Sequence, residues 1–281
     1  LTPAYNPMIG MGWVARGGTY VVANIRGGGE YGPAWHRAAL RENRPRAYED
    51  LAAVARDLVD RGVTTPGELG VEGGSNGGLL TGVMLTRYPE LFGALVCSVP
   101  LLDMKRFHLL LAGASWVAEY GDPDDPDDWE FISKYSPYQN ISAQRRYPPV
   151  LITTSTRDDR VHPGHARKMT AALEAAGHSV RYYENMEGGH AGAADNPQIA
   201  FRAALAAGPG CCLLRPGAKR LGDRAPERLG HVGQGEAGRG PAAEHGQRHQ
   251  RHQHRPGPGA DRTVHGTFQP DELLRTVTYS L

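Results

Sequence analysis

The sequence has little from which to build a covalent framework. It contains three cysteines, Cys97, Cys211 and Cys212, and none stands in the CxxC spacing of a metal site. Adjacent cysteines rarely form a framework disulfide, and Cys97 lies in the apolar run GALVCSV, which predicts a buried and inert thiol. This cysteine usage favours a reducing, cytoplasmic location.

Long apolar runs and an excess of one charge are also missing. No stretch approaches the roughly 18 apolar residues of a membrane span, so we expect no membrane partner. The 31 basic and 30 acidic residues give a formal net charge of +1, which offers no electrostatic reason to expect nucleic acid. The chain opens on LTPAYNPMIGMG without a signal-peptide pattern or an initiator Met, so we expect its true start to lie upstream.

Residues 1–206 have the pattern of a folded domain with a sizeable core. Amphipathic segments alternate there with apolar, β-branched runs. Buried strands are predicted at 19–25, 69–73, 94–99, 149–155 and 180–186. In the helical segment 45–62 the apolar residues fall on one face, and Gly62 supplies the stop. The alternation predicts an α/β fold with a parallel sheet and crossover helices.

The composition changes abruptly in residues 207–281. This segment is rich in Gly, Arg, Pro, His and Gln and has no apolar periodicity. It cannot bury enough apolar surface to offset the entropy lost on ordering, so we expect a low-complexity, disordered tail. Such a composition is typical of an alternate reading frame of GC-rich DNA, and we hypothesise a frameshift near residue 207.

Two stretches resemble metal sites only superficially, and we predict no metal. The tail histidines lack a second ligand group at a strict spacing: His245, His249, His252 and His254. The acid-rich stretch GDPDDPDDWEF lacks the glycine and the terminal glutamate of a calcium loop. Its aspartates are predicted to cap a helix that starts near Trp129.

The Gly-rich stretch GGSNGG follows the predicted strand at 69–73 and precedes a helical pattern that Pro89 ends. Gly73, Ser75 and Gly77 fit the Gly-x-Ser-x-Gly pattern of a nucleophile elbow. Glycines two residues to either side of the serine remove side chains that would clash where the chain reverses. Between a strand and a helix, this pattern favours Ser75 as a nucleophile over a plain loop residue.

A serine hydroxyl is a weak nucleophile alone, so a base and an orienting carboxylate are needed. In α/β-hydrolases they follow the serine in the order acid, then histidine, each on a loop after a strand. The strand at 149–155 leads into Asp158 and Asp159, and the residues alone do not choose between them. The strand at 180–186 leads into His190. Three competing histidines do not follow a strand in this way: His162, His165 and His178.

A second hypothesis comes from NIRGGGEYG, which contains a literal GxGxxG at Gly27, Gly29 and Gly32. Asp50 lies near the spacing of a ribose-binding acid, so the motif is compatible with a nicotinamide-dependent oxidoreductase. However, the helix of such a site should begin within the motif so that its amides face the pyrophosphate, and here Pro33 follows the last glycine. We therefore favour a structural turn and expect no cofactor.

Six stretches together resemble the catalytic domain of the prolyl oligopeptidase family, serine peptidases that cut short peptides after proline. They are YVVANIRGGGEYGPAWH, GGSNGGLL, VPLLDMKRFH, GASWVAEYGDPDDP, TTSTRDDRVHPGHARKM and EGGHAGAADN, and the likeness runs from residue 1 to about residue 206. The resemblance implies an α/β-hydrolase fold, a monomer and no cofactor. It implies a triad in which Asp158, by its position in the DDR motif, orients His190 toward Ser75.

The resemblance also assigns residues around the triad. The backbone N–H of Asn76 is expected to donate to the oxyanion. Trp116 matches an indole that stacks on the substrate proline, Arg160 matches an arginine that binds a substrate carbonyl, and Tyr120 lines the same pocket. Without the resemblance, Trp116 reads as a core aromatic and Arg160 as a surface ion-pair partner.

The chain departs from the family pattern in three places. We expect no β-propeller that screens substrates by size within these 281 residues, and we expect a tyrosine oxyanion donor and the opening strands upstream of LTPAYNP. The expected closing helix breaks at GPGCC. Besides the disfavoured oxidoreductase, three functions therefore stay open. They are a proline-specific serine peptidase, an esterase or acyl-peptide hydrolase with the same triad, and an inactive fragment.

Overall fold

A computed structural model describes residues 7–207 and 275–279. Within these residues one parallel sheet has the strand order β1-β6-β2-β3-β4-β5. The strands are β1 (Tyr20–Val22), β2 (Leu69–Gly74), β3 (Ala94–Ser98), β4 (Val150–Ser155), β5 (Val180–Asn185) and β6 (Arg275–Tyr279). The five strands predicted from the sequence all form, and the α/β fold is confirmed.

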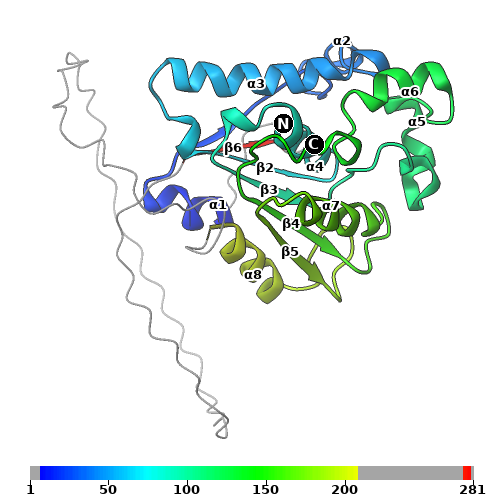
Figure 1. The fold of residues 1–281 in the computed structure, drawn as a ribbon. Helices are drawn as coiled ribbons and strands as arrows, with labels where there is room; N and C mark the ends of the chain where they lie inside the picture. Colours follow the sequence, from blue (N-terminus) through cyan, green and yellow to red (C-terminus); the bar gives the residue numbers. More distant parts are fainter. Residues whose placement is uncertain (1–6, 208–274, 280–281) are drawn as a thin grey trace, which may run out of the picture. The chain divides into compact units, whose positions relative to one another are not determined.

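Helices cover both faces of the sheet (Figure 1). Those of the described part are α1 (Pro7–Gly12), α2 (Pro33–Arg37), α3 (Pro45–Asp60), α4 (Asn76–Arg87), α5 (Val117–Tyr120), α6 (Pro126–Ser133), α7 (Gly164–Ala175) and α8 (Asn196–Ala207). Helices α3, α4 and α7 contribute to the large core on one face. Helices α1 and α8 border a small cluster around Val96 and Leu151 on the other face. None of the described helices is long and apolar enough to cross a bilayer.

The burial of the central strands explains their continuous apolar runs. Every residue of β3 and β4 is buried, because helices pack on both faces of a parallel sheet. Helix α3 instead buries a single stripe, in which Tyr48, Leu51 and Ala55 have no exposed surface. Gly62 follows with φ 66°, in the left-handed region where glycine ends helices. The capping prediction also holds, since the side chain of Asp125 accepts from Asp127 N at the start of α6.

One strand lies where the sequence predicts a disordered tail. The segment Arg275–Tyr279 forms β6, which pairs in parallel with both β1 and β2. Its stretch RTVTY alternates threonine and valine, and these β-branched residues favour a strand. The tail's composition as a whole obscured this short stretch, so the expectation was wrong for these five residues. Residues 208–274, including the tail histidines, lie outside the described residues.

Candidate active site

Ser75 occupies the turn between β2 and α4. Its backbone has φ 59° and ψ −116°, which a residue with a side chain adopts only under strain. Ser75 N donates to Ser98 O at the end of β3, which anchors the turn to the sheet. A Cβ on Gly73 would lie 2.2 Å from the carbonyl oxygen of Gly77, so the turn requires glycine at position 73. The local geometry is that of the predicted elbow.

Three loops bring Ser75, Asp158 and His190 together. His190 Nε2 lies 3.1 Å from Ser75 Oγ. On the other side of the ring, His190 Nδ1 lies 2.9 Å from both carboxylate oxygens of Asp158. Asp159, the other aspartate that the residues left open, is exposed. A chain of this kind can move a proton from a hydroxyl to an imidazole while a carboxylate stabilises the charged ring.

Asp158 is held in its ionised form by the loop that follows β4. Its side chain has no exposed surface, and Oδ1 also accepts from Arg160 N and Val161 N at 2.9 Å each. Burial alone would raise the pKa of Asp158, but the hydrogen bonds from His190 and the two backbone amides outweigh it and lower the pKa. A buried carboxylate with this many donors keeps its charge beside the imidazole.

The loop that carries His190 is organised by Asn185, the last residue of β5. Asn185 Oδ1 accepts from Glu187 N and Gly188 N. Its amide group donates to the carbonyl of Gly192 at the far end of the loop. Asn185 is buried, so these bonds have little competition from water. The loop is therefore closed around one side chain, and His190 lies at its tip.

The three competing histidines make other contacts. His165 is buried, and its Nδ1 accepts from Asp103 N, while burial lowers its pKa to about 4. His162 Nδ1 accepts from Gly164 N at the start of α7. His178 stacks on the Tyr147 ring with the ring centroids 4.2 Å apart. Each of these three rings thus makes contacts away from Ser75, and among the four candidates it is His190 that contacts Ser75 Oγ.

A sequence model of the prolyl oligopeptidase family matches residues 9–207. The chain belongs to the prolyl oligopeptidase family. It is 53% identical over 205 residues to an uncharacterized peptidase of Sinorhizobium fredii and 43% identical over 158 residues to the prolyl endopeptidase of Dictyostelium discoideum. These alignments cover 73% and 56% of this chain, but 28% and 21% of the two relatives.

Solved structures of the family agree with the fold. A post-proline cleaving enzyme of Rickettsia typhi superposes with a TM-score of 0.63 at 44% sequence identity. The superposition covers 67% of this chain and 27% of the Rickettsia typhi chain. The chain thus spans about a quarter of the length of the family members it matches.

The residues that the family resemblance assigns to the substrate pocket lie on the helical segments 111–120 and on the loop after β4. Trp116 ends the short helical segment Leu111–Trp116, is half-buried and packs against the main core. Arg160 is exposed, and its carbonyl accepts from Ala112 N, which ties the Asp158 loop to that segment. No ion pair to Arg160 occurs among the described residues, so its guanidinium group is not engaged as a surface ion-pair partner there.

The third residue assigned to the pocket, Tyr120, makes contacts that sequence reasoning missed. Tyr120 is buried, and its hydroxyl donates to Asn76 Oδ1 at 2.8 Å. The same oxygen accepts from Arg44 Nη2 at 2.5 Å, and Arg44 Nη1 donates to Glu119. Arg44 and Asn76 are far from Tyr120 in the sequence. Arg44 lies outside every quoted stretch, while Glu119 lies within GASWVAEYGDPDDP but was assigned no role.

The GxGxxG stretch of this family member is a structural turn. Asp50, at the spacing of a ribose-binding acid, instead accepts from Arg26 Nε at 2.8 Å and Arg26 N at 2.9 Å. Gly27 N donates to Trp35 O, and the Gly27 carbonyl lies 2.8 Å from His36 Nδ1. Helix α2 begins after the motif and has five residues. The Asp50 carboxylate and the Gly27 backbone are thus engaged within the protein, which argues against the oxidoreductase hypothesis.

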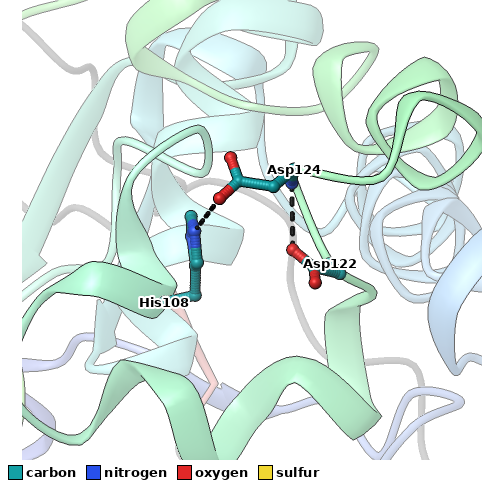
Figure 2. A group of neighbouring side chains, drawn as sticks. All are labelled: His108, Asp122 and Asp124. Atoms are coloured by element: carbon teal, nitrogen blue, oxygen red, sulfur yellow. Dashed lines mark hydrogen bonds and ion pairs between the residues drawn. The ribbon is translucent and has the colours of Figure 1, made fainter.

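Figure 2 shows a group of neighbouring side chains, His108, Asp122 and Asp124. His108 Nε2 lies 2.9 Å from Asp124 Oδ2, and the Lys105 ammonium lies 3.7 Å from the other oxygen of that carboxylate. The hydrogen bond with His108 lowers the pKa of Asp124. Asp122 accepts from Asp124 N. The carboxylate of Asp124 thus already has a hydrogen-bond partner in His108 and a cation in Lys105, and a lysine this close would repel a metal ion.

Proposed function

We propose that this chain carries the catalytic site of a serine peptidase that hydrolyses short peptides on the carboxyl side of proline. The observation that carries the proposal is the hydrogen-bonded chain from Ser75 Oγ through His190 to the buried Asp158. The strained backbone of Ser75 supports it, because strain of this kind persists where surrounding structure holds a functional group in place.

In the proposed reaction Ser75 Oγ attacks the carbonyl carbon of the scissile bond, and its proton passes to His190 Nε2. Asp158 holds the Nδ1 proton and stabilises the imidazolium. His190 then gives the proton to the leaving amine as the C–N bond breaks, which leaves an ester on Ser75. Water attacks this ester with His190 again as base, and the peptide acid leaves with Ser75 restored.

The oxyanion of each tetrahedral intermediate needs hydrogen-bond donors. Asn76 is the first residue of α4, so its backbone N–H has no acceptor within the helix. The N-terminus of a helix also favours negative charge. We assign this N–H as one oxyanion donor, and removal of such a donor typically costs about a hundred- to a thousandfold in kcat.

The proposed proline specificity rests on the family and on the half-buried Trp116. Relatives carry the names prolyl endopeptidase and post-proline cleaving enzyme. The flat pyrrolidine ring of proline suits stacking on an indole, and the exposed Arg160 can donate to a carbonyl of the bound peptide. Tyr120 would close the same pocket from the side of Asn76.

The test compares three substrates on the full chain. A chromogenic peptide with proline before the cleaved bond is expected to be hydrolysed, the matched peptide with alanine in place of proline much more slowly, and neither by Ser75→Ala. Trp116→Ala is expected to reduce the preference for proline by raising KM. Equal cleavage of both peptides would refute the specificity. Hydrolysis of a simple acyl ester with neither peptide cleaved would favour the esterase.

A further inference from the structure

Arg44 is a buried cation that the triad does not explain. It precedes α3, and only 4% of its surface is exposed. Burying a guanidinium group without partners is costly, so a buried arginine normally has acceptors fixed around it. Burial alone would lower the pKa of Arg44, but the phenols of Tyr48 and Tyr120 and the Glu119 carboxylate outweigh it and raise the pKa. Arg44 therefore stays charged.

The partners of Arg44 connect two parts of the proposed site. Its Nη2 donates to Asn76 Oδ1 and its Nη1 to Glu119 Oε1, both at 2.5 Å. Its guanidinium carbon lies 5.1 Å from the centroid of the Tyr120 ring. Tyr120 donates to Asn76 Oδ1 at 2.8 Å, so the amide oxygen of Asn76 accepts two bonds from different elements. Glu119 and Tyr120 belong to α5, which directly follows Trp116.

The side chain that Arg44 and Tyr120 bind belongs to Asn76, whose backbone N–H is the proposed oxyanion donor. Asn76 follows Ser75, and we assign its N–H to the oxyanion. Two bonds to the Asn76 amide oxygen restrict the rotation of this residue and, with it, the direction of the N–H. An oxyanion donor is effective only when it is aimed in advance at the position where charge develops. The charged partner makes one of these bonds stronger than a neutral hydrogen bond.

We propose that Arg44 is a positioning residue that directs the Asn76 N–H toward the oxyanion. Through its bond to Glu119 it also connects Asn76 to helix α5, which borders the proposed substrate pocket. This proposal rests on the proposed function, since it concerns the oxyanion donor of the same site. A role in stability alone is the alternative, because any buried arginine with two acceptors contributes to folding. The two differ in whether the effect of Arg44 passes through the Asn76 side chain.

A double-mutant cycle in the full chain separates them. Arg44→Met removes the donor and Asn76→Ala removes the acceptor while keeping the backbone N–H. The readouts are the rate at which a fluorophosphonate phosphonylates Ser75 and the kcat for the proline peptide. Both rates are divided by the fraction of folded protein. Arg61→Met, an exposed arginine just after α3, is the matched control and is expected to leave both rates unchanged.

Each single variant at positions 44 and 76 is expected to lower kcat about 10- to 100-fold with KM changed by less than about threefold. If Arg44 acts through Asn76, the double variant is no slower than the slower single one, to within about twofold. Losses that multiply in the double variant would overturn the proposal. A kcat for Arg44→Met within about twofold of wild type would overturn it as well.

Two further variants keep the proposal testable if Arg44→Met does not fold. Arg44→Lys keeps the charge but reaches one acceptor, and it is expected to slow phosphonylation of Ser75 several-fold relative to wild type. Tyr120→Phe removes the second bond to Asn76 Oδ1 and is expected to slow phosphonylation several-fold. If neither changes the rate, Arg44 does not position the donor. Phosphonylation needs the oxyanion site but no proline, so a chain that labels yet spares proline peptides refutes the substrate assignment alone.

Discussion

Replacing Asp158 with asparagine removes the charge beside His190 without changing the shape of the side chain at position 158. In the structure Asp158 Oδ1 accepts from the amides of Arg160 and Val161, and both oxygens lie 2.9 Å from His190 Nδ1. An asparagine must present one oxygen and one NH2 group to the same neighbours. With the oxygen on the backbone amides, the NH2 group takes the place of Oδ2, 2.9 Å from His190 Nδ1, where it would face Nδ1–H donor to donor.

The backbone N–H groups of Arg160 and Val161 determine the orientation of the side-chain amide in Asp158→Asn. If its NH2 faced them, two buried donors would be left without an acceptor, at about 1–3 kcal/mol each. The favoured orientation keeps the oxygen on Arg160 N and Val161 N, which places the NH2 against His190 Nδ1. That nitrogen must then accept, so the ring proton moves to Nε2 and faces Ser75. In this tautomer His190 cannot take the serine proton.

We expect Asp158→Asn to lower kcat about 10⁴-fold at neutral pH, the size of loss that the wrong tautomer causes in serine proteases of another fold. The steady-state rate on the proline peptide measures it, and ¹⁵N chemical shifts of the His190 ring report the tautomer directly. Thermal unfolding serves as the control, and the midpoint should change little because the substitution is isosteric. A loss smaller than about tenfold, or a ring that keeps its proton on Nδ1, would show that Asp158 does not set the tautomer.

Gly73→Ala should destabilise the fold by about 1–3 kcal/mol and abolish labelling of Ser75, because its Cβ would overlap the Gly77 carbonyl at 2.2 Å. Gly74→Ala is the control, since its Cβ has no neighbour closer than 3.6 Å, and denaturant unfolding is expected to show it near neutral. Asn185→Ala should lower kcat at least about tenfold by releasing the loop after β5, and protection of that loop from hydrogen exchange should fall with it. Burial raises the pKa of Asp103, but the bond from Lys168 contributes to a net lowering, so the free energy of unfolding should fall as the pH drops below about 4, and less steeply in Asp103→Asn.

The strands could be predicted, and so could the three loops that bring the candidate triad together, because both leave local signals. A buried strand in a parallel sheet is a short apolar run, and each catalytic candidate follows such a run directly. Ser75 carried the strongest signal, since the glycines around it are demanded by the turn itself. His190 could be separated from three other histidines by its place after a strand. The structure shows the physical reason, because each competitor contacts the backbone or an aromatic ring elsewhere.

The contacts around Asn76 could not be predicted in this way. Arg44, Asn76 and Glu119 come from three elements, and only the fold brings them within hydrogen-bonding distance. A single arginine before a helix has no periodicity or spacing that distinguishes it from a surface charge. The strand β6 was missed for a different reason. Its five residues lie near the end of the compositionally biased segment 207–281. The composition of that segment concealed the strand propensity of Arg275–Tyr279.

The central claim is that Ser75 is a nucleophile activated by His190. It is tested most directly by treating the full chain with a fluorophosphonate and measuring the intact mass and the modified peptide, beside Ser75→Ala and His190→Ala. The account predicts one adduct, located on Ser75, that is absent from Ser75→Ala and at least about a thousandfold slower in His190→Ala. A folded chain that forms no adduct, or labelling that persists in Ser75→Ala, would contradict it.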